Sequence, residues 1–178
     1  MFTMRGGCWC GCILFGNGRE AFGRQLGFAN GEFLELVRVA LNGKQSCTSE
    51  CVAAAMRKVK KDAPAVKMLL SYADTEQGHF GTIYQATNWI YLGESKGARY
   101  FIVKGRRMHS TTCGSNGWKC NISWLRQNVD PKAQEIQSWA KRKYVYFFDK
   151  KLRKQWQARA LPYPKKHDNT ETSECTGC

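Results

Sequence analysis

The sequence predicts an α/β (α+β) protein, a single domain in which helices flank a mixed central sheet. Short apolar segments of strand length alternate along the chain with longer amphipathic segments that carry a helical period. At 178 residues, the chain is long enough to bury one proper core. Its 43% of hydrophobic and 24% of charged residues are ordinary for a soluble globular protein. We expect the domain to cover residues 1–165 and the polar tail, residues 166–178, to be disordered.

Five apolar segments have the features of strands. Each is short, rich in β-branched or aromatic residues, and bounded by turn residues. The predicted strands are residues 8–15, 33–41, 66–72, 99–103 and 144–148. The third lacks a clean alternation of apolar and polar residues, which is typical of a central strand buried on both faces. The glycine-rich residues 17–30 predict a loop between the first two strands.

Four segments are predicted helices. In the first, Thr48 or Ser49 can cap a helix that runs to about Lys61 and has one apolar face. That face consists of Cys51, Val52, Ala55, Met56 and Val59. In the second, Thr82 opens a helix that Gly93 ends, and its first residues, Thr-Ile-Tyr-Gln, fit a capping box. Residues 131–141, with proline in the first turn, and the basic residues 150–157 are the other two.

The composition carries a large excess of positive charge. Lys and Arg number 28 against 14 Asp and Glu, which gives a formal net charge of +14. Such an excess is typical of a nucleic-acid-binding protein, with an anionic membrane surface as the alternative. Residues 141–166 are the most basic segment, with interleaved aromatic residues that suit base stacking, although a solvated surface explains a charge run as well. The candidate nucleic-acid contacts are Arg106 and Arg107, in a segment 106–109 that we expect to be a loop, and Lys150, Lys151, Arg153 and Lys154.

Neither a membrane span nor a secretion signal is visible in the sequence. No segment approaches the roughly 20 apolar residues of a spanning helix, and the N-terminal apolar segment is short. We therefore expect an intracellular protein whose nine cysteines are reduced. The cysteine spacings do not match a zinc site, because the C-x-x-C pair of Cys175 and Cys178 has no second pair. We expect no metal site.

The most informative segment is residues 69–93, LLSYADTEQGHFGTIYQATNWIYLG. It combines a buried strand, a polar loop and a helix start, and α/β proteins place ligands in loops beyond the carboxyl ends of strands. The loop carries Asp74 and His79, its glycines allow close backbone approach, and the amides at the helix start favour anions. Each residue alone fits an ordinary turn or core role better, and only the combination indicates a site. The absence of a P-loop and of a G-x-S-x-G motif argues against nucleotide or serine hydrolysis.

Several segments resemble one family, the phage Mom-type DNA adenine-modification proteins. They are ELVR at residues 35–38, Ser49 ahead of AAAMR, SYAD at 71–74, QGHFGTIYQATNWIYLG at 77–93 and KYVYFFDKKLRK at 143–154. The resemblance spans most of residues 8–165 and implies a GNAT-type acyltransferase-like fold. It also implies transfer of a carbamoylmethyl (acetamido) group to adenine N6 in phage DNA, which protects that DNA from host restriction. Double-stranded DNA is then the expected partner, and the cytoplasm of a bacterial host the expected location.

The resemblance also implies roles for single residues. The positions that match the family's functional residues are Arg38, Ser49, Asp74 and Tyr84. Because adenine N6 is a poor nucleophile, we assign Asp74 as the base or orienter of the amine and Tyr84 as a hydrogen-bond or proton donor. Arg38 would hold an anionic donor or a phosphate, and Ser49 a donor oxygen. His79 is a further candidate, as a base or as a metal ligand.

The donor molecule is left open by the sequence. The candidate donor-binding residues are Gln77, Gly78, Gly81 and Thr82. GNAT folds usually bind coenzyme A with Q/R-x-x-G-x-G/A, but here Phe80 stands where the first glycine after Gln77 would be. The expected donor is an acyl-CoA or another glycine-derived or acyl compound. On the acceptor side, Trp89 or Tyr91 would stack on an adenine extruded from the duplex.

Two other functions fit the sequence. One is a GNAT-type N-acetyltransferase acting on another amine, which would need a working coenzyme A site. The other is a non-enzymatic, basic DNA-binding protein, a degenerate copy of the family. Because the chain begins almost inside its first predicted strand, we also expect it to be short at the N-terminus compared with the family.

Overall fold

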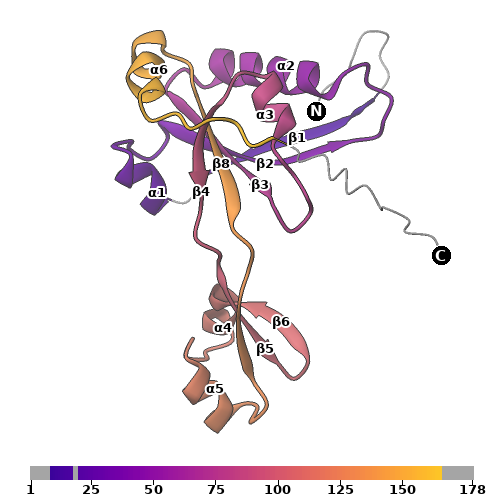
Figure 1. Cartoon of the computed structure of the whole chain (residues 1–178), viewed down its shortest axis with the longest axis vertical. Coiled ribbons are helices and arrows are strands. Elements are labelled where there is room, and N and C mark those ends of the chain that lie inside the picture. Colours follow the sequence, from indigo (N-terminus) through magenta and orange to yellow (C-terminus); the bar gives the residue numbers. More distant parts are fainter. Residues whose placement is uncertain (1–8, 18–19, 166–178) are drawn as a thin grey trace, which may run out of the picture.

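The computed structural model of this chain describes residues 9–17 and 20–165. The predicted disordered tail, residues 166–178, lies outside the described residues, as do residues 1–8. The described part has a mixed α/β architecture with two lobes, as Figure 1 shows. A five-stranded sheet forms the large lobe and a three-stranded sheet forms the small lobe. The predicted α/β class with a mixed sheet is confirmed, whereas the domain boundary at residue 165 stays a prediction.

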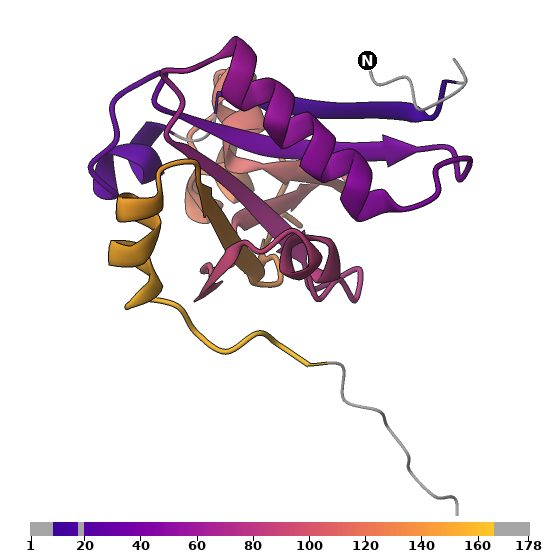
Figure 2. The ribbon, with the colours of Figure 1, turned by 90° about the horizontal axis from the view of Figure 1, so that it is seen from above.

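The large lobe has helices on both faces of its sheet. Its strands lie in the order β1 (Gly11–Gly16), β2 (Phe33–Leu41), β3 (Met68–Asp74), β8 (Lys141–Phe147), β4 (Ile90–Glu94). Helix α2 (Thr48–Asp62) joins β2 to β3 and lies along one face (Figure 2), burying four residues of the predicted apolar stripe. Apolar residues of α1 (Glu20–Gln25) and α6 (Lys150–Gln157) belong to the second core cluster, on the other face. The sheet is therefore buried on both sides, as expected for its central strands.

The two parallel strands of this sheet separate along their length. β2 and β3 pair over only three positions, from Phe33 with Met68 to Glu35 with Leu70. Beyond them β2 continues against β1, and β3 continues against β8. The Ser71 hydroxyl donates to the Leu36 carbonyl oxygen at 2.8 Å, in place of the next backbone hydrogen bond between the strands. We call this separation the fork, and it opens toward the carboxyl ends of the two parallel strands.

The small lobe is inserted between β4 and β8. Its strands β6 (Arg106–His109), β5 (Arg99–Val103) and β7 (Gln134–Gln137) lie in that order, with helices α4 (Ser110–Ser115) and α5 (Ile122–Asn128). It has a separate apolar core of Phe101, Val103, Cys113, Leu125 and Ala133. Two segments, residues 95–98 and 138–140, connect it to the large lobe, and we call them the stalk (Figure 1). The Ser138 amide donates to the Ala98 carbonyl between these segments, and the Ser95 amide donates to the carbonyl of Lys141 at the start of β8.

Several predicted elements are confirmed. The strands at 33–41 and 99–103 and the helix at 150–157 have the predicted bounds, and the helix at 48–62 ends one residue later. The other three predicted strands exist with ends shifted by one to three residues. In each case a short apolar run or a clear helical stripe is flanked by residues that favour turns.

The prediction of one helix over residues 82–93 is wrong. Helix α3 (Thr82–Ala86) is only five residues long, and the chain then forms strand β4. Asn88 has a φ of 63°, in the left-handed region that ends helices and that asparagine tolerates. The aromatic and β-branched residues Trp89–Tyr91 then pair as a strand against β8.

Three further predictions are wrong. Residues 131–141 form strand β7 and the start of β8 rather than a helix, because pairing with β5 outweighs the local signal of Pro131. The predicted loop at 17–30 contains α1, whose six residues are too few to show a helical period. The segment 106–109, expected as a loop, is strand β6, and α4 and α5 were not predicted. Among the described residues, none of the helices has the length and apolar character needed to cross a membrane.

Candidate functional site

The fork opens into a cleft of about 730 Å³, which we call the fork cleft. Residues of both diverging strands line it together with the β3–α3 loop and the first turn of α3. The cleft brings together six residues that the sequence predicted, namely Arg38, Gly78, His79, Gly81, Thr82 and Tyr84. Segments more than 40 residues apart in the sequence thus meet at one cavity, in the place where α/β folds bind ligands. The side chain of Arg38 is exposed there, and its guanidinium forms no ion pair with any other described residue.

The β3–α3 loop is held in place by β8. Arg142 donates to the His79 carbonyl at 2.8 Å, and its guanidinium lies 4.5 Å from the centre of the Phe80 ring. The Tyr144 hydroxyl donates to the Phe80 carbonyl at 2.5 Å. The predicted capping box is wrong, because Gly81, with a φ of 75°, is the N-cap and no side chain caps the helix. The loop therefore has a fixed backbone, and His79 lines the cleft from it.

Tyr84 lines the fork cleft and stabilises the fork through Ser71. Its hydroxyl lies 2.8 Å from the Ser71 oxygen, and its ring packs against Trp89 and Tyr144. Ser71 has one proton and the Leu36 carbonyl can only accept, so the Tyr84 hydroxyl is the donor that satisfies Ser71. Burial raises the pKa of Tyr84 above its ordinary value, which keeps this hydroxyl protonated.

This chain of hydrogen bonds leads to a stability prediction. Ser71→Ala leaves both the Leu36 carbonyl and the Tyr84 hydroxyl without a partner, and we expect a cost of about 1–3 kcal/mol in the free energy of unfolding. Tyr84→Phe removes one hydroxyl but leaves Ser71 bonded to Leu36, so it should cost less. Urea unfolding of both variants measures the difference. If Tyr84→Phe lost more unfolding free energy than Ser71→Ala, that result would contradict the assignment of Ser71 as the residue that joins β3 to β2 at the base of the fork.

Asp74 does not line the fork cleft. It ends β3, directly after Tyr72 and Ala73, which both line the cleft. Its carboxylate lies 3.2 Å from the Lys141 ammonium and accepts a hydrogen bond from the Glu76 amide at 3.0 Å. The predicted base is thus near the fork but outside the cleft, which holds five other predicted residues of the same loop and helix.

Ser49 and Gln77 also lie outside the fork cleft. Ser49, in the first turn of α2, lines a separate pocket of about 420 Å³, whereas its neighbour Thr48 lines the fork cleft. The Ser49 hydroxyl lies 2.9 Å from the Cys47 sulfur, and this hydrogen bond lowers the pKa of the Cys47 thiol. Gln77 is exposed on the loop. The predicted donor-binding roles of Ser49 and Gln77 stay predictions.

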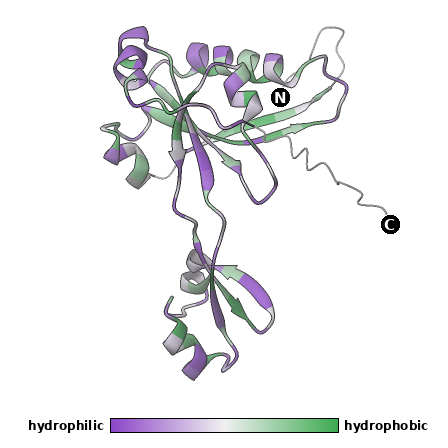
Figure 3. Cartoon of the chain, viewed as in Figure 1, coloured by the Kyte–Doolittle hydropathy of each residue, from purple (hydrophilic) through white to green (hydrophobic). Residues whose placement is uncertain are grey.

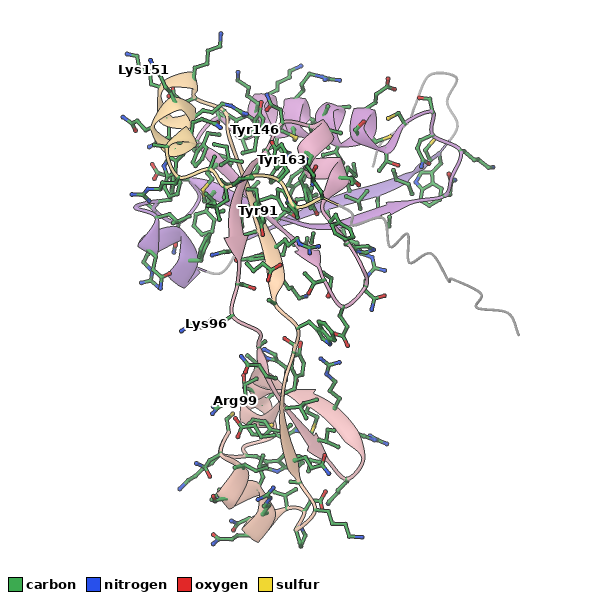
Figure 4. The ribbon with its side chains drawn as sticks, in the orientation of Figure 1. Tyr91, Lys96, Arg99, Tyr146, Lys151 and Tyr163 are labelled. Atoms are coloured by element: carbon green, nitrogen blue, oxygen red, sulfur yellow. The ribbon has the colours of Figure 1, made fainter. Side chains whose placement is uncertain are left out.

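The predicted stacking residues are in the core. Trp89 is fully buried and Tyr91 is 8% exposed. Figure 4 shows the Tyr91 side chain among its neighbours within the large lobe, and its ring lies 5.2 Å from that of Tyr144. Both side chains are packed in the core of the large lobe, and their stacking on an extruded adenine stays a prediction.

The predicted cationic surface is divided between the lobes. Figure 3 shows hydrophilic segments along both α6 and β6, but Figure 1 places α6 on the large lobe and β6 on the small lobe. Lys150, Lys151 and Lys154 are exposed on α6, and Figure 4 shows Lys151 projecting outward. Arg153 donates to the Asn88 carbonyl at 2.6 Å, which ties α6 to the turn before β4.

The two arginines of β6 lie near the β3–α3 loop. Arg107 forms an ion pair with Glu76 at 3.5 Å, between the small lobe and that loop, and its guanidinium lies 4.4 Å from the centre of the Tyr100 ring. Arg106 is exposed beside it. The cations of β6, rather than those of α6, therefore lie close to the β3–α3 loop, which lines the fork cleft.

A second cavity that the sequence did not predict lies between the lobes. It has a volume of about 230 Å³, and we call it the stalk pocket. Its lining comes from β2, β3, both stalk segments, β5 and β8, and it includes Glu35, Tyr72, Tyr100, Trp139 and Lys141. Val37 and Tyr72 line both the stalk pocket and the fork cleft, so these two side chains border both cavities. Alternation along β2 could have placed Glu35 and Val37 on one face, but nothing in the sequence indicated the stalk.

No cluster of three or more His, Cys, Asp or Glu residues with the geometry of a metal site occurs in residues 9–17 and 20–165. The free cysteines Cys113 and Cys120 belong to the small lobe. Burial raises the pKa of the Cys113 thiol. The chemistry of the two cavities therefore has to be considered from their aromatic, acidic and basic side chains.

Comparison with known proteins gives two matches. A curated protein described as methylcarbamoylase mom of Escherichia phage Mu is 26% identical to this chain over 143 residues, which are 76% of this chain and 58% of that protein. The matched region thus spans less than two thirds of the length of that relative. A model of the Mom protein family matches residues 2–165, a region that includes the fork, both cavities and the stalk. On that match, which covers nearly the whole chain, the protein belongs to the Mom protein family.

Proposed function

We propose that this protein is a GNAT-like transferase that adds a carbamoylmethyl group to the N6 amine of adenine in phage DNA and so protects that DNA from host restriction. The observation that carries the proposal is that Val37 and Tyr72 line both the fork cleft and the stalk pocket. A donor in one cavity and an acceptor in the other would approach each other at this common wall. The phage Mu relative is described as a methylcarbamoylase, and a methylcarbamoyl group is an isomer of the proposed carbamoylmethyl group with the same composition.

The fork cleft is the proposed donor site. Its volume of about 730 Å³ lies within the range of about 300–1,000 Å³ that is typical of small-molecule sites. Arg38 supplies a cation without a competing partner among the described residues, which suits an anionic donor such as an acyl-CoA. Gly78, with a φ of 66°, has open space at its Cβ position and allows a ligand to approach the backbone. A mixed sheet with one diverging parallel pair supports the GNAT-like assignment.

The proposed reaction forms one bond and breaks another. The N6 nitrogen bonds to the transferred carbon, the bond from that carbon to the donor's leaving group breaks, and N6 loses a proton. Because the N6 lone pair is delocalised into the ring, alignment and a proton acceptor matter most. Asp74 is the proposed acceptor of that proton, with His79 as the alternative on the cleft side. Tyr84 is a positioning residue, since its hydroxyl is bonded to Ser71.

Nucleoside mass spectrometry tests the proposal directly. Plasmid DNA from cells that express the full chain should contain an adenine nucleoside heavier by one carbamoylmethyl group, which is absent from cells with the empty vector. Unmodified adenine from cells that contain folded protein would contradict the proposal. An acetylated amine elsewhere would then favour an N-acetyltransferase, and salt-sensitive DNA binding without modification would favour a non-enzymatic DNA-binding protein.

A further inference from the structure

We propose that the stalk pocket binds the target adenine after it has been extruded from the duplex, and that Trp139 stacks on the extruded base. This inference rests on the proposed function, since it names the acceptor site of that transferase. An adenine paired in a duplex presents its N6 amine to thymine, so an enzyme that acts on N6 has to take the base out of the stack. Trp89 and Tyr91 are buried in the core, whereas Trp139, which lines the stalk pocket, is 65% exposed.

Trp139 is an exposed indole on a fixed backbone. Its side chain is 65% exposed, the largest exposed fraction among the large apolar residues of the described chain. On one side of it, Ser138 exchanges two hydrogen bonds with Ala98, at 2.7 and 2.8 Å. On the other side, the Ser95 amide donates to the Lys141 carbonyl at 2.7 Å, and the Lys141 amide donates to the Ser95 hydroxyl. A rigid, exposed aromatic residue loses little conformational entropy when a ligand covers it.

The size and lining of the pocket suit one nucleobase. Its volume of about 230 Å³ is below the roughly 300–1,000 Å³ of sites for larger small molecules. Three aromatic residues, Tyr72, Tyr100 and Trp139, contribute to the lining. The Tyr100 ring is held from outside by Arg107 at 4.4 Å and by the edge of His109 at 5.1 Å. Stacking on such rings is the usual way in which proteins bind single unpaired bases.

The polar groups of the pocket match the acceptor atom. The N6 amine of adenine donates hydrogen bonds and therefore calls for acceptors. Glu35 lines the pocket directly, and Asp74 lies 3.2 Å from the ammonium of Lys141, which also lines it. Both carboxylates belong to the sheet face that carries Tyr72, because side chains alternate along β2 and β3. An adenine in this pocket would thus lie beside carboxylates and next to the wall shared with the fork cleft.

Cations lie around the mouth of the pocket, where the DNA backbone would pass. Lys96 belongs to the pocket lining, and Figure 4 shows its side chain projecting from the stalk. Arg106 is exposed on the small lobe, next in sequence to Arg107, whose guanidinium lies 4.4 Å from the ring of Tyr100 in the pocket lining. These side chains can neutralise phosphates on either side of an extruded nucleotide. The stalk pocket therefore combines stacking surface, hydrogen-bond acceptors and phosphate contacts for one nucleotide.

A binding experiment with the full chain tests the pocket without the donor. Fluorescence anisotropy compares two short labelled duplexes, one with an adenine opposite an abasic site and one with the same adenine opposite thymine. Extrusion costs less from the first duplex, so the native protein should bind it about tenfold more tightly. Trp139→Ala should abolish this preference, Trp139→Phe should keep most of it, and Trp9→Ala, which removes another exposed indole, should not change it.

Equal binding of the two duplexes by the native protein, or an unchanged preference in Trp139→Ala with an unchanged melting temperature, would overturn the pocket assignment. Nucleoside mass spectrometry on the same variants separates this outcome from failure of the proposed function. Modified adenine in cells with Trp139→Ala at the native level would refute the pocket and leave the transferase function intact. A Trp139-dependent preference without modification by the native protein would support the pocket and refute the transferase function.

Discussion

Replacing Asp74 by asparagine is expected to lower the rate of adenine modification by at least about 100-fold while DNA affinity stays the same. Asparagine has nearly the same shape, and its side-chain oxygen can still accept the hydrogen bond from the Glu76 amide. It cannot accept a proton from N6, and the loss of a positioned base typically costs about 10²–10⁴-fold in rate. The amount of modified nucleoside over time, measured by mass spectrometry, gives the rate, and anisotropy gives the affinity.

Asp62→Asn is the matched control for this experiment. Asp62 also pairs with a lysine, Lys58, at 2.6 Å, but it lies at the end of α2 and lines neither cavity. The control removes the same charge and a similar ion pair, so it should retain the native rate. Full modification by the Asp74→Asn protein would move the role of base to another residue, with His79 and Glu35 as the next candidates.

Gly81→Ala is expected to destabilise the large lobe much more than Gly78→Ala. Both glycines lie in the β3–α3 loop with positive φ, 75° and 66°, so an alanine at either position costs about 1–2 kcal/mol of backbone strain. A Cβ at Gly81 would also lie 2.4 Å from the Tyr144 ring, whereas nothing lies within 4 Å of a Cβ at Gly78. This collision in a packed region adds about 1–3 kcal/mol.

Urea unfolding of the two variants isolates the effect of the collision, because the strain is common to both. The Tyr144 hydroxyl bonds to the Phe80 carbonyl, so a displaced ring also releases the loop that lines the fork cleft. We therefore expect Gly81→Ala to reduce adenine modification even at temperatures where it remains folded. Equal unfolding free energies for the two variants would show that the ring moves aside without cost.

The sequence predicted those parts of the fold that local patterns determine. The apolar stripe of α2 and the alternation of β2 were sufficient to predict these two elements, because each element is long enough to show its period. The segment from Thr82 to Gly93 was predicted as one helix because its capping and aromatic residues fit a helix. In the structure, the left-handed backbone of Asn88 ends the helix, and pairing with β8 makes the rest of the segment a strand. Strand β7 was missed for a similar reason, since its partner β5 lies more than 30 residues away.

The sequence predicted residues of the fork cleft but not the stalk pocket. Arg38, His79 and Tyr84 line one cavity, as the loop and helix signals suggested. The stalk pocket depends on Tyr100 and Trp139, whose segments come together through the insertion of the small lobe, and no local pattern reports such a contact. For the same reason Trp89 was chosen over Trp139, because exposure of an aromatic residue depends on tertiary packing that sequence periodicity does not describe.

The narrow connection of the small lobe has a consequence for how this protein can be altered. The chain leaves β4 and returns in β8, and these strands are antiparallel neighbours in which Glu94 pairs with Arg142. A tight two-residue turn can therefore join them as an ordinary hairpin, with the small lobe cut out as a cassette. The large lobe would keep its own core and the fork cleft, whereas the stalk pocket would lose Tyr100 and Trp139. On the proposed function, such a hairpin variant would retain the donor site and lose the acceptor site, so the two sites can be separated at the stalk.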